Sequence, residues 1–526
     1  MIVSEAVTVA HAGVPALRDA SFTVPEGELV LVVGPTGSGK TSLLQCLGGR
    51  PAAAAQVTGR VLVDGVDLRD RSADGSRALV GLVRQDPAAE MMSGTVESVI
   101  AAGVRPRADD PHAGQRQVEE SLDLLGLATL RDRPVAELSG GQQQRVAIGA
   151  ALAAGPRVLV LDEPTSALDP VAAEEVLAIL HRLVHDVGIT VVVAEHRLER
   201  VVHHADSVLL VEDGLVTGPF HPAAGMARST IRPPVVELGL RLGWTPLPLS
   251  VRAARRQVRG LRATLAAAPA APAALAAPTA PAPPAAGTQV RVEVQRLSLV
   301  RGDVVALRTV TLQVRPGEVV ALMGRNGAGK SSLLGILDGA LQPTSGRTAV
   351  SGRSGLAPQD PKALLTDATV DHQLSANDEA FMLPAGATSA VLEHLAPRLA
   401  RDRRPAELSE GQRMCVALSL VLARGSEVVL LDEPTRGLDY PAKARLTILL
   451  TDLAEAGRAI IVATHDVELA AEVATRAVIL AEGEVVADGP ARRILSDSPA
   501  FAPQVAKIMA PLPLLRVSDV AAAATP

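Results

Sequence analysis

Gly34-Pro35-Thr36-Gly37-Ser38-Gly39-Lys40-Thr41 decides the fold, and Gly324-Arg325-Asn326-Gly327-Ala328-Gly329-Lys330-Ser331 repeats it. Each stretch follows a short apolar run and precedes a segment with helical patterning (29–33 and 41–47; 319–323 and 331–337). A G-x-x-x-x-G-K-[ST] loop between a strand and a helix presents consecutive backbone N–H groups, which is the geometry that cradles phosphates. Two copies in the same context argue against chance glycine-rich turns. We call residues 34–41 and 324–331 the first and second phosphate loops.

Further motifs follow each loop in the same order. A glutamine comes first, then a Leu-Ser-x-Gly-Gln run, then an apolar run ending in Asp-Glu, then a histidine. The first set is Gln85, Ser139-Gly140-Gly141-Gln142, Asp162-Glu163 and His196. The second set is Gln359, Ser409-Glu410-Gly411-Gln412, Asp432-Glu433 and His465. The two sets of acidic pairs stand 270 residues apart, so the chain reads as an internal duplication.

The amino-acid composition limits the number of domains and the class of protein that can be expected. The chain has 526 residues, so two or three domains are expected, and its 48% hydrophobic content supports two sizeable cores. Aromatic residues make up only 1%, which suits parallel strands buried on both faces by Ala-rich helices. A net charge of -6 gives no reason to expect nucleic acid. The two cysteines, Cys46 and Cys415, form no disulfide framework or metal-binding set.

No targeting segment or membrane span is expected. The N-terminus lacks a basic region ahead of an apolar stretch. The uncharged run 263–290 is long enough to cross a bilayer, but it is mostly alanine and contains six prolines, each of which costs a helix about 3 kcal/mol. We therefore interpret residues 263–288 as an Ala/Pro linker.

The residue types predict a chemistry for these motifs. Lys40 and Lys330 would reach the β- and γ-phosphates of a nucleotide, and Thr41 and Ser331 would ligand Mg²⁺. Asp162 and Asp432 end buried strands and would hold the Mg²⁺ shell, while Glu163 and Glu433 would take a proton from an attacking water. His196 and His465 would hydrogen-bond the γ-phosphate. Gln85 and Gln359 would touch the Mg²⁺ or the attacking water.

Leu138-Ser-Gly-Gly-Gln142 resembles the signature motif of the ATP-binding-cassette (ABC) ATPases. Together with the other motifs, it extends the resemblance to this family over residues 3–213 and 292–489. The resemblance implies an α/β chain of two tandem P-loop NTPase domains. Each would have a mainly parallel core sheet, an antiparallel β subdomain and a helical subdomain. It also implies that each ATP lies between the phosphate loop of one cassette and the signature of the other, where Ser139 or Ser409 and neighbouring amides meet the γ-phosphate. We call residues 138–142 and 408–412 the first and second signatures.

These expectations divide the chain into five parts. Residues 1–222 and 289–500 form the two ABC ATPase domains, residues 223–262 form an appendage to the first, and residues 501–526 form a flexible tail. The appendage carries five arginines at helical spacing, at positions 252, 255, 256, 259 and 262. They fit either a solvated helix face or a face that docks on a membrane or partner.

Two departures from the family pattern stand out. Glu410 occupies a signature position where glycine is usual, and a carboxylate near phosphates is repulsive unless it points away. The site that uses the second signature is therefore expected to be the weaker one. In addition, the position that usually stacks on adenine falls on His11 and Arg301, both of which can stack flat on a base.

The residues after each glutamine narrow the family further. Gln85-Asp86-Pro87 with Thr95-Val96, and Gln359-Asp360-Pro361 with Thr369-Val370, resemble segments of energy-coupling-factor (ECF) importer ATPases. The resemblance implies a peripheral subunit on the cytoplasmic side of the cell membrane, with a transmembrane scaffold subunit and a membrane substrate-binding subunit as partners. Its substrate would be a vitamin, a vitamin precursor or a transition-metal ion. The alternatives are a fused ATPase of a sugar or nucleoside importer and a twin-cassette factor acting on ribosomes.

Overall fold

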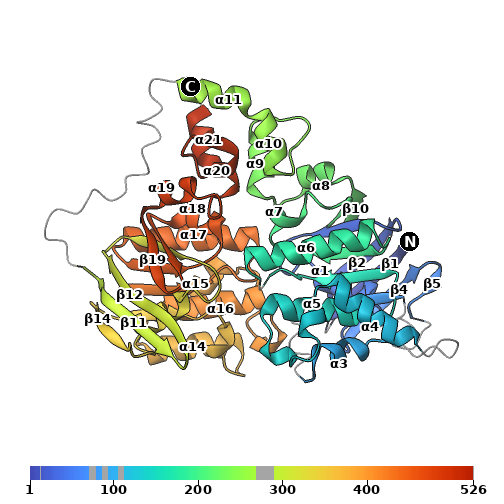
Figure 1. The fold of residues 1–526 in the computed structure, drawn as a ribbon, viewed down its shortest axis with the longest axis horizontal. Helices are drawn as coiled ribbons and strands as arrows, with labels where there is room; N and C mark the ends of the chain where they lie inside the picture. Colours follow the sequence, from blue (N-terminus) through green and yellow to red (C-terminus); the bar gives the residue numbers. More distant parts are fainter. Residues whose placement is uncertain are drawn as a thin grey trace. The chain divides into compact units, whose positions relative to one another are not determined.

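The computed structural model describes residues 1–11, 13–69, 79–85, 93–104, 112–166, 168–267 and 290–524. They form two compact units (Figure 1). The first contains residues 1–236 and 245–249, and the second contains residues 237–244 and 250–526. The segments 86–92 and 268–289, which include part of the first Q-D-P segment and most of the expected linker, lie outside the described residues.

The first unit is built on a six-stranded sheet in the order β10-β9-β3-β8-β7-β6. Its strands are β3 (Leu29–Val33), β6 (Val80–Val83), β7 (Val158–Asp162), β8 (Thr190–Ala194), β9 (Ser207–Glu212) and β10 (Leu215–Phe220). All neighbours pair in parallel except β10, which runs antiparallel to β9. Every residue of β3, β7 and β8 is buried, which explains why their sequences are continuous apolar runs rather than alternating ones.

The second unit repeats this sheet in the order β15-β16-β17-β13-β18-β19. Its strands are β13 (Val319–Met323), β15 (Ser354–Ala357), β16 (Val428–Asp432), β17 (Ala459–Ala463), β18 (Arg476–Ala481) and β19 (Glu484–Pro490). The strand that precedes each phosphate loop and the strand that ends in each acidic pair flank the same middle strand, β8 or β17. Their carboxyl ends therefore lie at one edge of the sheet, and the duplication seen in the sequence is a duplication of topology.

Each unit also has a separate antiparallel sheet. In the first unit β1 (Ile2–His11) pairs with β2 (Val14–Val24) and β4 (Ala55–Val63), and β4 also pairs with β5 (Val66–Asp67). In the second unit β11 (Val292–Arg301) pairs with β12 (Val304–Val314) and β14 (Ser345–Val350). The described part of the second unit has no counterpart of β5, which matches the shorter sequence between its phosphate loop and Gln359.

Helices complete each unit. Those of the first unit are α1 (Lys40–Leu47), α3 (Val96–Ala101), α4 (Ala113–Leu124), α5 (Gly140–Leu152), α6 (Pro170–His185), α7 (Leu198–Val201) and α8 (Pro222–Arg228). Those of the second cassette are α13 (Lys330–Leu337), α14 (Val370–Ala380), α15 (Ala387–Leu395), α16 (Glu410–Leu422), α17 (Tyr440–Glu455), α18 (Val467–Val473) and α19 (Ala491–Asp497). Figure 1 shows α14, α15 and α16 grouped apart from β11, β12 and β14. The expected fold class is confirmed: two P-loop NTPase cassettes, each with a core sheet, an antiparallel sheet and a helical part.

The appendage and the tail differ from the expectation. The tail contains α20 (Gln504–Met509) and α21 (Val517–Ala524), and its apolar side chains Val505, Ile508 and Met509 are buried. Within the second unit, α10 (Val251–Gln257) contacts α20, and α11 (Arg259–Ala267) contacts α21. The appendage after α9 (Pro234–Arg241) thus packs with the C-terminal helices instead of belonging wholly to the first domain. Alanine and proline dominate the composition of the tail, so the sequence did not indicate that its few larger apolar residues would be buried.

The arginine-rich segment lies on α10 and α11. Ala254, Val258 and Leu265 are buried, whereas the arginines at 252, 255, 256 and 259 are exposed and Arg262 is half-buried. The apolar side of these helices is therefore covered by protein. No helix in the described ranges combines the length and the apolar character that crossing a bilayer requires.

We predict that Met509→Ala lowers the stability of the second unit by about 2–5 kcal/mol, because truncating a buried Met leaves a cavity. Met509 is 0% exposed. The matched control is Met382→Ala, since Met382 is 92% exposed and its truncation removes almost no packing. Thermal unfolding of both variants checks the docking of the tail. Equal midpoints would show that α20 does not stabilise the unit.

Candidate functional site

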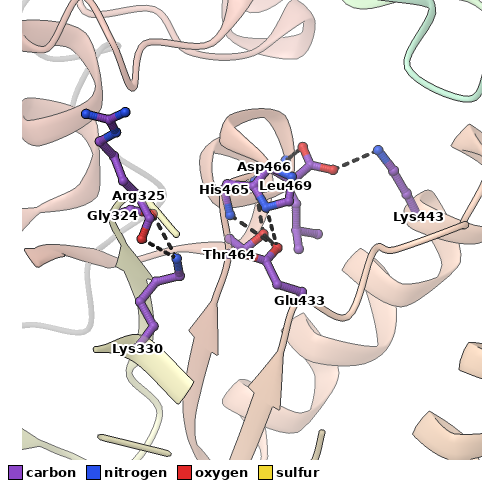
Figure 2. Close-up of polar contacts among 9 residues, drawn as sticks. All are labelled: Gly324, Arg325, Lys330, Glu433, Lys443, Thr464, His465, Asp466 and Leu469. Carbon is purple, nitrogen blue, oxygen red and sulfur yellow. Dashed lines mark hydrogen bonds and ion pairs between the residues drawn. The ribbon is translucent and has the colours of Figure 1, made fainter. Parts of the chain in front are cut away.

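The two phosphate loops have the same geometry. In each, the loop lysine is buried and folds back on its own loop. Lys40 Nζ donates to the carbonyl oxygens of Gly34 at 2.7 Å and Pro35 at 3.0 Å. Lys330 Nζ donates to those of Gly324 at 2.8 Å and Arg325 at 3.2 Å, as Figure 2 shows. Each ammonium group is thus held against the first two residues of its own phosphate loop, where it could contact a bound phosphate.

The glycine before each lysine is required by the backbone. Gly39 has φ 110° and Gly329 has φ 103°, a region that residues with a side chain rarely adopt. A Cβ on Gly39 would also overlap the carbonyl oxygen of Ala16, and one on Gly329 would overlap that of Ala306. These glycines let each loop turn directly into α1 or α13, so that the helix N-terminus faces the loop, an arrangement that favours anions.

The strand-ending aspartates lie against the phosphate-loop hydroxyls. Thr41 hydrogen-bonds Asp162, and Ser331 hydrogen-bonds Asp432. Burial, reinforced by the charge of Glu163, raises the pKa of Asp162 to about 6 despite the bond from Thr41. Burial likewise raises the pKa of Asp432, again against the bond from Ser331. A buried carboxylate whose charged form is disfavoured is suited to a nearby cation.

The next residue of each pair, Glu163 or Glu433, faces a different set of partners. Both take the left-handed conformation, with φ 51° and 50°. Glu163 has both oxygens engaged, because His196 Nε2 lies 2.6 Å from Oε1 and Gln85 Nε2 donates to Oε2 at 2.8 Å. The histidine and the glutamine predicted for the first site are therefore brought together on its glutamate.

Glu433 is held differently, as Figure 2 shows. Its Oε2 accepts from the Thr464 hydroxyl at 3.2 Å and from the His465 amide at 3.3 Å, and it lies 2.8 Å from His465 Nδ1. Its Oε1 has no hydrogen-bond partner among the described residues. Burial alone would raise the pKa of Glu433, but the hydrogen bond and charge of His465 and the charge of Lys330 outweigh it and lower the pKa.

Gln359 does not repeat the contact of Gln85. It follows β15 as Gln85 follows β6, but it is exposed and donates no hydrogen bond to Glu433 within the described ranges. The two sites therefore differ in how their glutamates are restrained. Oε1 of Glu433 has no hydrogen-bond partner among the described residues, whereas both oxygens of Glu163 have polar partners.

The signatures begin their helices as capping boxes. Ser139 accepts from the Gln142 amide at 3.4 Å and its own amide donates to the Gln142 side chain at 2.9 Å. Ser409 and Gln412 make the same pair of bonds at 3.2 and 3.0 Å. Both serines are exposed. Each signature thus places a hydroxyl and a helix N-terminus at the surface of its unit, and Gly140, Gly141 and Gly411 lie in the first turn.

The residues present fit a nucleotide with a divalent cation. Buried polar atoms at these sites lack hydrogen-bond partners among the described residues: Ser38 Oγ, Asp162 Oδ1 and Asp432 Oδ1. Thr41 with Asp162, and Ser331 with Asp432, would hold Mg²⁺, with Gln85 and Gln359 as additional candidates. No cluster of three or more His, Cys, Asp or Glu is arranged to hold a metal in the described part of the chain.

The residues expected to stack on adenine have different settings. His11 Nε2 lies 3.0 Å from Ser42 Oγ, so its ring is next to the helix that follows the first phosphate loop. Arg301 ends β11 and is exposed. Stacking by either residue stays a prediction.

Sequence reasoning missed residues around the two histidines. Asp466 caps α18 through the Leu469 amide at 3.2 Å and pairs with Lys443 Nζ at 2.7 Å (Figure 2). Together with Thr464 it anchors both sides of His465. In the first unit Glu195 precedes His196, is fully buried, and accepts from the Thr165 amide at 2.8 Å. The polar residues on either side of each histidine, in Thr-His-Asp at 464–466 and Glu-His-Arg at 195–197, could have indicated these contacts in the sequence.

We predict that Glu195→Gln stabilises the first unit at high pH. Burial raises the Glu195 pKa from 4.5 to about 7. The protonated form thus favours the fold, and this contribution is complete below pH 4.5 and lost as the pH rises through about 7. Glutamine has no charge to bury, so the free energy of unfolding of the variant should exceed that of the wild type by on the order of 2 kcal/mol at about pH 8 and match it near pH 4.5. A gain of the same size at both pH values would contradict the ionisation of Glu195.

Comparison with known proteins gives the class that this geometry defines. The model of the ABC transporter family matches residues 17–166 and 307–436, one match in each unit, and the chain belongs to that family. It is an ABC ATPase with two cassettes in one chain. A Streptomyces avermitilis protein assigned as an ABC transporter ATP-binding protein is 50% identical, with 99% of each chain covered. One from Streptomyces coelicolor is 49% identical with full coverage of both chains. One from Methanosarcina mazei is 32% identical over 91% of this chain and 86% of the relative.

Solved structures share the twin-cassette fold. A model of ribosome-bound archaeal Pelota and ABCE1 matches with a TM-score of 0.66 and 22% identity, over 94% of this chain and 82% of that chain. The RNase-L inhibitor matches with a TM-score of 0.59 and 21% identity, over 94% and 95%. At these identities the likeness concerns the fold alone.

Proposed function

We propose that this chain binds and hydrolyses ATP with Mg²⁺ to energise a membrane importer of the ECF type. Lys40 and Lys330 would bind the phosphates, Thr41, Asp162, Ser331 and Asp432 would hold Mg²⁺, and Glu163 and Glu433 would accept the proton of the attacking water. His196 and His465 orient these glutamates. The 50% identity to an assigned ABC transporter ATP-binding protein over nearly the whole chain supports the transport role.

The segment that follows each motif glutamine, Gln85 or Gln359, supports the choice of an ECF-type importer. In the second unit Gln359 is followed by Asp360, whose side chain accepts from the Lys362 amide at 3.0 Å, and then by Thr369, which caps α14. In the first unit Thr95 caps α3 in the same way. Each cap fixes the start of the helix that follows its glutamine in the sequence. We propose that a transmembrane scaffold subunit docks there, on the cytoplasmic side of the cell membrane.

The substrate would be recognised by a separate membrane subunit, so a vitamin, a vitamin precursor or a transition-metal ion fits equally well. The chain would contribute the energy of ATP hydrolysis and the scaffold would transmit it. Nothing in this division of labour requires a substrate pocket in the chain itself.

Affinity purification of the tagged chain from detergent-solubilised native membranes tests the proposal. We expect a helical scaffold protein and a small integral-membrane binding protein to be recovered with it. Recovery of two large permease subunits would replace the ECF assignment with a sugar or nucleoside importer. Recovery of ribosomal proteins with no membrane partner would contradict the transport role. Glu163→Gln/Glu433→Gln, which should trap ATP without hydrolysing it, is a control for partners that bind only one nucleotide state.

A further inference from the structure

The second signature differs from the first at a position that finds a compensating partner elsewhere in its own unit. Glu410 stands where the first cassette has Gly140, and Arg436 stands where it has Ser166. The two residues are far apart in sequence, yet Arg436 Nε lies 2.5 Å from Glu410 Oε1. The Glu410 side chain is 13% exposed and that of Arg436 is 30% exposed. A pair this shielded is screened less by solvent than a surface ion pair.

The backbone brings these side chains together. Glu410 is the first residue of α16, and Arg436 lies in the loop between β16 and α17, three residues after Glu433. A Cβ on Gly411 would overlap the carbonyl of Gly437, and Gly437 has φ 69°. The start of the signature helix and this loop are therefore in direct backbone contact. This contact places position 410 next to the loop, where the Glu410 side chain pairs with Arg436.

The charge of the pair bears on what the signature can bind. A helix N-terminus carries a partial positive charge that favours anions. A carboxylate in the first turn would offset this partial charge and repel phosphate. A guanidinium ion-paired with the carboxylate offsets its charge. Without Arg436, the second signature would present a net negative charge beside Ser409.

We propose that Arg436 is a positioning residue that neutralises Glu410 and so preserves the second signature as a phosphate-binding end. The first cassette needs no such residue because Gly140 carries no charge, and Ser166 stands at the loop position. The proposal rests on the proposed function, because it assumes that this signature meets ATP. It replaces the expectation that Glu410 alone makes its site weak.

The test is the ATP affinity of the purified full chain with Mg²⁺, measured in a Lys330→Ala background that leaves the first phosphate loop. That loop is the one that the family arrangement pairs with the second signature. We expect Arg436→Ala to weaken ATP binding about tenfold, the size expected for one unpaired charge at moderate effective dielectric. Glu410→Gln/Arg436→Ala should return to within about twofold of the background, because no charge is left unpaired. Glu410→Gly/Arg436→Ser, the residue pair of the first cassette, should do the same. The matched control Ser166→Ala should have no effect.

Two results would overturn the inference and leave the proposed function intact. One is an Arg436→Ala chain with unchanged ATP affinity. The other is a double variant as weak as Arg436→Ala, which would mean that Arg436 supports the loop rather than cancelling a charge. Failure of every variant and of the background chain to bind ATP would instead count against the proposed function.

Discussion

Glu433→Gln is expected to remove most of the ATP hydrolysis of the purified chain. The Glu433 pKa is lowered by His465 and Lys330, so the carboxylate is ionised at neutral pH, and its Oε1 has no partner in the described structure. It can therefore accept a proton from water, whereas an amide cannot. Loss of a general base costs about 10²–10⁴-fold in rate. A phosphate-release assay at saturating ATP measures the effect.

The matched variant is Glu163→Gln, which should lower the rate less. Both oxygens of Glu163 are held by His196 and Gln85, so this carboxylate is less available in the described state. Losses of equal size from the two substitutions would contradict the asymmetry. ATP binding should survive in both variants, since the hydrogen bonds and ion pairs described for these two side chains involve no phosphate-loop residue, and this separates loss of the base from loss of the site.

Lys330→Ala is expected to abolish ATP binding at the second phosphate loop while leaving the first intact. The buried ammonium, held at 2.8 Å from the Gly324 carbonyl, is the charge that would meet the β- and γ-phosphates. A charge-assisted contact of this kind contributes about 1.5–3 kcal/mol, and two such contacts correspond to a loss of about 10²–10⁴-fold in affinity.

Equilibrium dialysis with labelled ATP checks this variant, and the bound nucleotide should fall from two per chain to one. Lys362→Ala is the control, because Lys362 is exposed and lies outside the loop. Lys40→Ala should give the mirror result. Two ATP molecules bound to Lys330→Ala would contradict the assigned role of the lysine.

The fold was predictable where residue type and local order are enough. The apolar runs before the phosphate loops and before the acidic pairs became β3, β13, β7 and β16, because strands buried on both faces need continuous apolar sequence. The glycines of the phosphate loops identify their conformation directly. The capping boxes of both signatures are likewise local, since serine and glutamine three residues apart can satisfy each other.

The remaining features depend on contacts between distant segments. Lys443 with Asp466, and Glu410 with Arg436, join residues whose proximity follows only from the packing of helices and loops. The different restraint of Glu163 and Glu433 arises from the positions of Gln85 and Gln359, and from Thr464, whose hydroxyl donates to Glu433 where the first unit has Glu195. The tail was misjudged because its alanines and prolines dominate the composition, while the few apolar residues of α20 decide the packing.

The most direct test of the account is the number of ATP molecules bound by the Glu163→Gln/Glu433→Gln chain in the presence of Mg²⁺. Both phosphate loops have the geometry of a binding site, and the double substitution should stop turnover without touching either loop. We predict two ATP molecules per chain, measured by equilibrium dialysis at saturating nucleotide. A single ATP per chain, or none, would contradict the claim that both cassettes hold a functional nucleotide site.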